Sequence, residues 1–225
     1  MANYSIEKPK LICLDLVDTL VYKRKERFTD LLIDQLGKFG INDLDREATT
    51  VLIRERYVEY SFGNCPNDED YLRSIVYNYI NDPQAQEVVR SLLPELFSFY
   101  EPVEGSLEFI EYCASKYKLV LASNFLLHWA ETLLEKFGLS HYFEKLYISA
   151  EMGYRKPARE FYWEILKDYP HFRKSEILMI GDSVVNDYHG ARDLGMSSIL
   201  FNNGMLPPFY HQDIGLTFEE IKQII

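Results

Sequence analysis

Four apolar residues lead into two carboxylates and a threonine in Leu11-Ile12-Cys13-Leu14-Asp15-Leu16-Val17-Asp18-Thr19-Leu20. A short apolar run is typical of a strand that is buried on both faces of a parallel sheet. In open α/β sheets, ligands bind just outside the carboxyl ends of such strands. Asp15 is therefore a candidate nucleophile or metal ligand, although the same pattern also describes an ordinary strand that ends in a turn.

Three later segments carry polar side chains at the end of an apolar run or in a turn. In chain order they are Leu119-Val120-Leu121-Ala122-Ser123-Asn124, Gly153-Tyr154-Arg155-Lys156-Pro157 and Ile177-Leu178-Met179-Ile180-Gly181-Asp182-Ser183-Val184-Val185-Asn186-Asp187. Taken singly, each has an ordinary explanation as a turn or a helix cap. Their occurrence together and in this order favours one shared site.

The carboxylates of these segments indicate a cation site. Asp182 and Asp187 could converge with Asp15 on one ion, because three crowded carboxylates repel one another unless a metal neutralises them. Oxygen ligands with room for water and phosphate favour Mg²⁺. We therefore expect Mg²⁺ as the cofactor.

The remaining polar residues suit phosphoryl transfer, in which a protein mainly positions the reactants and neutralises charge. Lys156 would offset the charge that the carboxylates leave. Ser123 and Thr19 could donate hydrogen bonds to phosphoryl oxygens, and Asn124, next to Ser123, is a candidate substrate-binding residue. Asp15 could attack an electrophile covalently and so split a hard hydrolysis into two easier steps.

Apolar runs alternate with helical patterns over much of the chain. The runs are Leu11–Asp15, Lys118–Ser123, Lys145–Ser149, Glu176–Gly181 and Ser197–Phe201. The helical patterns are Ser106–Lys116, Trp129–Phe137, Arg159–Lys167 and Asn186–Leu194. This alternation predicts right-handed βαβ units and an α/β fold with a Rossmann-like parallel sheet, in which the strand that begins at Leu11 is central.

Residues 23–100 interrupt this alternation with helical patterns alone. These patterns are Phe28–Phe39, Ala48–Tyr60, Tyr71–Ile80 and Ala85–Phe97. We expect a smaller all-α domain at 23–100, inserted into an α/β core domain that is formed by 1–22 and 101–225. Near the carboxyl end, Thr217-Phe218-Glu219-Glu220 matches a capping box and predicts a last short helix.

The composition limits the class of protein. The 225 residues are 47% hydrophobic and 26% charged, which fits one large or two small globular domains. A net charge of −11 argues against a nucleic-acid-binding protein, which needs a basic face.

The three cysteines, Cys13, Cys65 and Cys113, have no CxxC spacing, which favours a reducing compartment without disulfides. Since no signal peptide or long apolar run fits the sequence, we expect a cytoplasmic protein without a membrane partner.

Together the four segments resemble the motifs of the haloacid dehalogenase (HAD) superfamily of hydrolases, over nearly the whole chain. The resemblance implies an HAD-like core with a helical cap inserted after the first strand. It implies that Asp15 is the nucleophile, that Thr19 and Ser123 contact the phosphoryl group, and that Lys156 stabilises Asp15 and the transferring group. The metal ligands it implies are Asp15, the backbone carbonyl of Val17, Asp182 and Asp187.

The chain departs from the family pattern at one position. Family phosphatases usually carry an aspartate two residues after the nucleophile, where its carboxyl protonates the leaving oxygen and later activates water. Here that position is Val17, while Asp18 occupies the next position and Thr19 keeps its place. Because a valine still offers its backbone carbonyl, we expect metal binding to survive and acid–base catalysis to be atypical or weakened.

Three functions fit these residues. The first is a Mg²⁺-dependent phosphatase of a small, anionic phosphorylated metabolite, acting through an aspartyl-phosphate at Asp15. The second is a haloacid dehalogenase, which needs no metal and lacks the second aspartate, but would leave Asp182 and Asp187 as excess charge. The third is a non-catalytic relative that binds a ligand without turnover.

Two further features have ordinary interpretations. The run Lys23-Arg24-Lys25-Glu26-Arg27 is either a solvated helix start or a means of attracting an anionic substrate. His128 and His189 lie just beyond motif residues, and we interpret both as helix-surface or packing residues rather than acid–base groups.

Overall fold

A six-stranded parallel sheet forms the centre of the protein. The structure is a computed structural model that describes residues 6–23, 27–64, 67–204 and 215–225. The strand order is β5-β4-β1-β6-β7-β8, and every neighbouring pair is parallel. The bounds are Leu11–Leu14 for β1, Lys118–Ser123 for β4, Lys145–Ile148 for β5, Ile177–Gly181 for β6, Ser197–Phe201 for β7 and Gly215–Leu216 for β8. The predicted α/β fold is confirmed, with β1 between β4 and β6.

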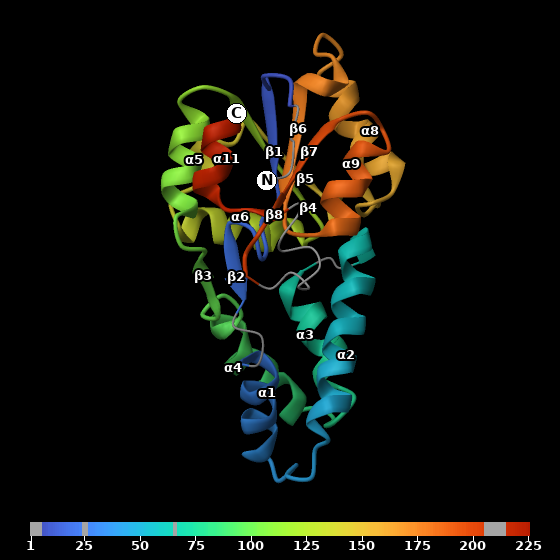
Figure 1. Cartoon of the computed structure of the whole chain (residues 1–225). Coiled ribbons are helices and arrows are strands. Elements are labelled where there is room, and N and C mark those ends of the chain that lie inside the picture. Colours follow the sequence, from blue (N-terminus) through green and yellow to red (C-terminus); the bar gives the residue numbers. More distant parts are fainter. Residues whose placement is uncertain (1–5, 24–26, 65–66, 205–214) are drawn as a thin grey trace.

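Helices cover both faces of this sheet (Figure 1). Every residue of β1 is buried, and its side chains alternate between the two faces. Ile12 and Leu14 belong to one hydrophobic cluster, whereas Leu11 and Cys13 belong to another. The first cluster includes residues of α5 (Ser106–Ala114), α6 (Leu127–Lys136) and α11 (Phe218–Ile224), and the second includes residues of α8 (Arg159–Asp168) and α9 (Gly190–Arg192).

The ends of the core helices differ from the sequence pattern in a few places. The helix predicted at Asn186–Leu194 begins earlier, as η5 (Val184–His189), because the Ser183 side chain accepts a hydrogen bond from the Asn186 N–H and caps it. The predicted capping box is present, with Thr217 and Glu220 bonded to each other's backbone N–H. Four short segments of the core had no sequence signal: η3 (Ser140–Tyr142), α7 (Ser149–Met152), η4 (Lys174–Glu176) and the strand β8.

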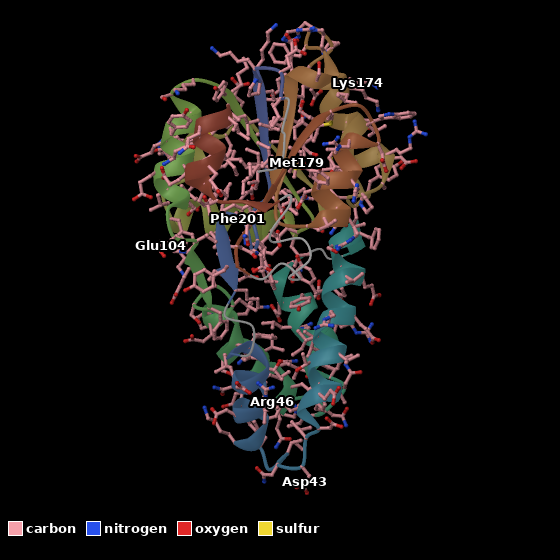
Figure 2. The ribbon with its side chains drawn as sticks, viewed as in Figure 1. Asp43, Arg46, Glu104, Lys174, Met179 and Phe201 are labelled. Atoms are coloured by element: carbon pink, nitrogen blue, oxygen red, sulfur yellow. The ribbon has the colours of Figure 1, made fainter. Side chains whose placement is uncertain are left out.

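The predicted helical region lies beyond one end of the core (Figure 1). It contains α1 (Arg27–Gly37), α2 (Arg46–Glu59), η1 (Tyr60–Asn64), α3 (Asp68–Val76), α4 (Gln84–Leu92) and η2 (Leu93–Glu95). In Figure 2, Asp43 lies at the tip of this region, opposite Lys174 at the other end of the molecule. Its buried side chains, such as Leu32, Leu72 and Val88, belong to the same hydrophobic cluster as Ile12 and Leu14 of β1.

An antiparallel pair of short strands connects the helical region to the sheet. β2 (Val21–Lys23) pairs with β3 (Tyr100–Pro102), with Lys23 opposite Tyr100. The expected domain boundaries, at 22/23 and 100/101, fall within this pair and stay a prediction.

Two properties expected from the sequence can be compared directly with the structure. Cys13 and Cys113 are buried free thiols, and Cys65 lies outside the described residues. Among the helices that the structure describes, none is long and apolar enough to cross a membrane.

Candidate active site

The carboxyl ends of β1 and β6 bring two of the predicted carboxylates together. Asp15 follows β1, and its N–H donates to the Ile180 carbonyl of the neighbouring strand at 3.0 Å. Asp182 follows β6, and Asp187 lies one turn further on in η5. One oxygen from each of the three aspartates lies within 4.8 Å of the others. The structure therefore assembles the predicted cluster Asp15, Asp182 and Asp187.

Lys156 connects two carboxylates of this cluster. Its Nζ lies 2.9 Å from Asp15 Oδ1 and 2.5 Å from Asp187 Oδ1, and it donates to the Ala122 carbonyl at 2.7 Å. Only 3% of the residue is exposed. Burial alone would lower the pKa of Lys156, but the charges of Asp15 and Asp187 outweigh it and raise the pKa. The amine is therefore held as an ammonium ion between two carboxylates.

Asn124 fixes the backbone of Lys156. Its Oδ1 accepts from the Lys156 N–H at 2.7 Å, and its Nδ2 donates to the Lys156 carbonyl at 2.9 Å. The side chain thus has a positioning role that the sequence did not indicate, because its partner comes from a distant turn. The predicted contact of Asn124 with substrate stays a prediction.

Thr19 and Ser123 lie at the same edge of the sheet. The Thr19 hydroxyl accepts from the Asp182 N–H at 3.1 Å and donates to Asp182 Oδ1 at 3.3 Å. This arrangement orients the Asp182 carboxylate toward the cluster. Ser123 is buried at the end of β4, beside Asn124. Contacts of both hydroxyls with a phosphoryl group stay predictions.

The charges of the site favour a bound cation. Burial and the charges of Asp15 and Asp187 raise the pKa of Asp182. Burial also raises the pKa of Asp187, although Lys156 opposes this shift. Three carboxylates therefore outnumber the one ammonium that the structure places among them, and the excess negative charge is unfavourable. Carboxylate oxygens are the ligands that Mg²⁺ prefers, so these residues fit a divalent ion.

Asp187 differs from the other two aspartates because it is fully buried. Its Oδ1 is 2.5 Å from Lys156 Nζ, and its Oδ2 accepts from the Ser183 N–H at 3.0 Å. Both oxygens are thus bonded to protein groups, which suits a carboxylate that lies next to the metal position. The predicted ligation by Asp187 and by the Val17 carbonyl is a proposal.

Gly181 makes room for Asp187. A Cβ atom at Gly181 would lie 2.2 Å from Asp187 Oδ2, far inside van der Waals contact. We expect Gly181→Ala to lower the free energy of unfolding by about 1–3 kcal/mol, because the buried carboxylate must shift. Urea unfolding measures this loss, with Gly37→Ala as a control, since a Cβ there meets only Asn42 Oδ1 at 3.4 Å. Equal stability of the two variants would contradict this packing argument.

A cavity of about 500 Å³ lies between the helical region and the end of β1. From the core and the β2–β3 pair it is lined by Val17, Asp18, Lys23, Tyr100 and Phe125. From the helical region it is lined by Phe28, Thr29, Arg46, Thr50, Ile53, Arg54, Tyr57 and Tyr71. Tyr57 bridges the two parts, because its hydroxyl donates to the Asn124 carbonyl at 2.8 Å. The cavity thus opens beside position 17, where the sequence lacks the expected carboxyl group.

A larger hollow at the opposite, amino-terminal end of the sheet contains none of the predicted site residues.

Three residues near the site were not predicted as part of it. Asn203 follows β7, and its Nδ2 donates to the Asp18 carbonyl at 2.8 Å and lies 3.4 Å from Asp182 Oδ2. Its place after a parallel strand is a signal that could have identified it. For Lys23 the signal is its basic run, for which attraction of an anionic substrate is one of two interpretations. Tyr57 has no such signal, because its place in the cavity depends on contacts between the helical region and the core.

The two histidines take no part in the carboxylate cluster. His128 is exposed, 3.8 Å from Asp68 of α3, and His189 ends η5 with its ring against Tyr188. Both positions agree with the surface or packing interpretation. Of the basic run, residues 24–26 lie outside the described part of the chain, whereas Lys23 lines the cavity.

Comparison with known proteins gives consistent matches. A family model described as haloacid dehalogenase-like hydrolase matches residues 48–201. The chain is 27% identical over 200 residues to a glyceraldehyde 3-phosphate phosphatase of Pyrococcus abyssi. The aligned residues make up 87% of this chain and 82% of that protein. This chain spans only about half the length of two other curated relatives. The matches cover 46% of the HAD hydrolase YfnB of Bacillus subtilis and 52% of the pyrimidine 5'-nucleotidase PynA of Streptococcus pneumoniae.

Solved structures share the fold at low sequence identity. A 2-haloacid dehalogenase of Pseudomonas syringae has a TM-score of 0.71 at 18% identity, covering 96% of this chain and 97% of that one. The magnesium-bound HAD hydrolase YfnB of Bacillus subtilis has a TM-score of 0.67 at 18% identity, covering 97% and 99% of the two chains.

Proposed function

The chain belongs to the haloacid dehalogenase-like hydrolase family, and from that premise we propose that it is a Mg²⁺-dependent phosphatase of a small phosphorylated metabolite. The observation that carries this proposal is the convergence of Asp15, Asp182 and Asp187 around the Lys156 ammonium at the carboxyl end of the sheet. Relatives named as phosphatases of glyceraldehyde 3-phosphate and D-ribitol 5-phosphate support the substrate class.

Asp15 acts as the nucleophile in this proposal. Its carboxylate attacks the phosphorus of the ester, and an aspartyl-phosphate forms that water then hydrolyses. The Lys156 ammonium, 2.9 Å from Asp15 Oδ1, orients the attacking carboxylate and offsets charge on the transferring group. Ser123 donates a hydrogen bond to a phosphoryl oxygen, and Thr19 does the same once its hydroxyl proton turns away from Asp182 Oδ1.

The proposed metal would be held by Asp15, Asp182 and the backbone carbonyl of Val17, with Asp187 nearby. When bound, Mg²⁺ supplies positive charge that neutralises the phosphoryl oxygens and the crowded carboxylates. The magnesium in the structure of YfnB, which shares this fold, supports the choice of ion.

A haloacid dehalogenase is the second candidate. Val17 favours it, because a dehalogenase does without the second aspartate, and a 2-haloacid dehalogenase shares the fold with a TM-score of 0.71. The three-carboxylate cluster opposes it, since a metal-free reaction leaves that charge unneutralised. A non-catalytic binding protein remains the third interpretation.

One assay separates these functions. Phosphorylated metabolites and 2-haloacids are supplied with Mg²⁺ and with a chelator, and release of phosphate and of halide is measured. The proposal expects phosphate release that requires Mg²⁺. Metal-independent halide release, or ligand binding without turnover, would overturn it. The cytoplasmic location and the absence of a nucleic-acid partner, both expected from the sequence, stay predictions.

The metal site has its own test. Asp182→Asn is expected to weaken Mg²⁺ binding by about 100-fold or more, since it removes a charged ligand and not merely an outer hydrogen bond. Isothermal titration calorimetry with Mg²⁺ alone measures this change. Asp34→Asn, at an exposed position of α1, serves as the control and should bind like the wild type. Unchanged affinity in Asp182→Asn would remove this aspartate from the metal site.

A further inference from the structure

The cavity beside Val17 contains few groups that can transfer a proton. Its titratable or charged lining residues are Asp18 after β1, Lys23 of β2, Arg46, Arg54 and Tyr57 of α2, Tyr71 of α3 and Tyr100 of β3. The two arginines stay charged at all ordinary pH values, so they cannot act as general acids. Burial raises the pKa of Tyr57 and of Tyr100 above the usual phenol value. Neither phenol is therefore suited to give up a proton near neutral pH.

Lys23 has the environment of an acid–base group. It lies on the two-stranded β2–β3 pair, opposite Tyr100, and lines the cavity together with Val17 and Asp18. Its Nζ lies 5.5 Å from the ring centre of Phe28 and 5.9 Å from that of Tyr100. Burial among these rings lowers the pKa of Lys23 to about 8, although the charge of Asp18 opposes the shift. A group with a pKa near the working pH is the most effective general acid or base.

We propose that the Lys23 amine is the general acid and base of the reaction, in place of the carboxyl group that position 17 lacks, and that the substrates are phosphate monoesters of alcohols. The inference rests on the proposed phosphatase function. Alkyl phosphates are the class that needs it, because an alkoxide leaves poorly unless it receives a proton.

The proton balance closes over one turnover. As Asp15 attacks phosphorus, the bond from phosphorus to the ester oxygen breaks, and the Lys23 ammonium gives its proton to that oxygen. An alcohol leaves, and Lys23 is then a neutral amine. In the second step this amine takes a proton from the water that attacks the aspartyl-phosphate. Inorganic phosphate and the free Asp15 carboxylate are released, and the ammonium is restored.

The test compares Lys23→Met and Lys23→Arg on an alkyl and an aryl phosphate. Lys23→Met should lower kcat/KM for glycerol phosphate by about 10²–10³-fold, within the usual contribution of a general acid. The kcat/KM for p-nitrophenyl phosphate reports only the steps up to release of nitrophenolate. It should change little, because nitrophenolate leaves without a proton, and this activity also shows that the variant is folded. Lys23→Arg keeps the charge but cannot give up a proton, so it should fail on the alkyl ester as Lys23→Met does. Lys38→Met, at an exposed position beside Asp34, is the matched control and should resemble the wild type.

Two further measurements distinguish proton transfer by Lys23 from stabilisation by its positive charge alone. In the wild type, kcat/KM for the alkyl ester should fall as the pH rises through about 8, since the ammonium is then lost. This decline should be absent for the aryl ester. Added methylamine should restore part of the alkyl-phosphate activity of Lys23→Met, and so should a second change, Val17→Asp, in the same variant.

Several outcomes would overturn the inference. Full alkyl-phosphate activity in Lys23→Arg would show that only the charge matters, and wild-type activity in Lys23→Met would show that the amine is dispensable. Loss of alkyl-phosphate activity in Asp18→Asn, with Lys23→Met unaffected, would assign the proton to Asp18. In each case aryl-phosphate turnover would leave the proposed phosphatase function standing, whereas absence of turnover of both esters by the wild type would overturn both proposals.

Discussion

Asp15→Asn is expected to lower the turnover of every phosphate ester by about 10⁴-fold or more, because the amide cannot attack phosphorus. The substitution nearly preserves the shape of a side chain that is 12% exposed. The loss should therefore reflect chemistry and not packing. Steady-state rates measure the loss, and the intact mass of acid-quenched enzyme detects the intermediate. The wild type should gain the mass of one phosphoryl group during turnover, and the variant should gain none.

Asp34→Asn is the control for this experiment, since Asp34 is an exposed carboxylate whose partner is the surface residue Lys38. It should retain wild-type rates and the phosphorylated species. If Asp15→Asn kept a rate near that of the wild type, or still formed the phosphorylated species, the nucleophile would be another residue. The proposed role of Asp15 would then be wrong, whatever the metal requirement of the enzyme.

The part of the site that follows the strands could be predicted from the sequence. β1 and β6 are fully buried apolar runs, so their ends are recognisable, and parallel strands present those ends at one edge of the sheet. Asp15 and Asp182 follow these two runs directly, and this position alone predicts that they lie together. Lys156 is different, because it lies in a turn, and its place in the site follows from a family resemblance and not from its own pattern.

The parts that the sequence did not reveal depend on contacts between distant segments. β2 and β3 have three residues each, too short for an alternating pattern, and they are strands only because they pair with each other. Lys23 lies in a charged run of the sequence, and its partial burial depends on Phe28 and on Tyr100 across that pair. The sequence also does not show that the Asn124 amide is bonded on both sides to the backbone of Lys156. Its predicted contact with substrate stays a prediction.

Lys156→Met is expected to lower the free energy of unfolding by about 3–5 kcal/mol, the usual cost of removing one partner from a buried ion pair. The ammonium lies between Asp15 and Asp187 and also donates to the Ala122 carbonyl, so its loss leaves several groups without their donor. Asp187 is completely buried and cannot turn toward water. Urea unfolding in the absence of Mg²⁺ measures the effect, and phosphatase turnover should fall as well.

A matched lysine and a double variant show whether the buried charge is the cause. Lys118 is half exposed and lies 2.8 Å from Glu144, so Lys118→Met should cost only about 0–1 kcal/mol, as surface ion pairs do. Adding Asp187→Asn to Lys156→Met should recover part of the lost stability, because a neutral amide then replaces the uncompensated carboxylate. Recovery would identify the unpaired charge of Asp187 as the source of the instability. The double variant could instead lose as much free energy of unfolding as the two single variants lose together. Lost packing around Lys156 would then explain the instability, and the side chain would stabilise the site through its contacts more than through its charge.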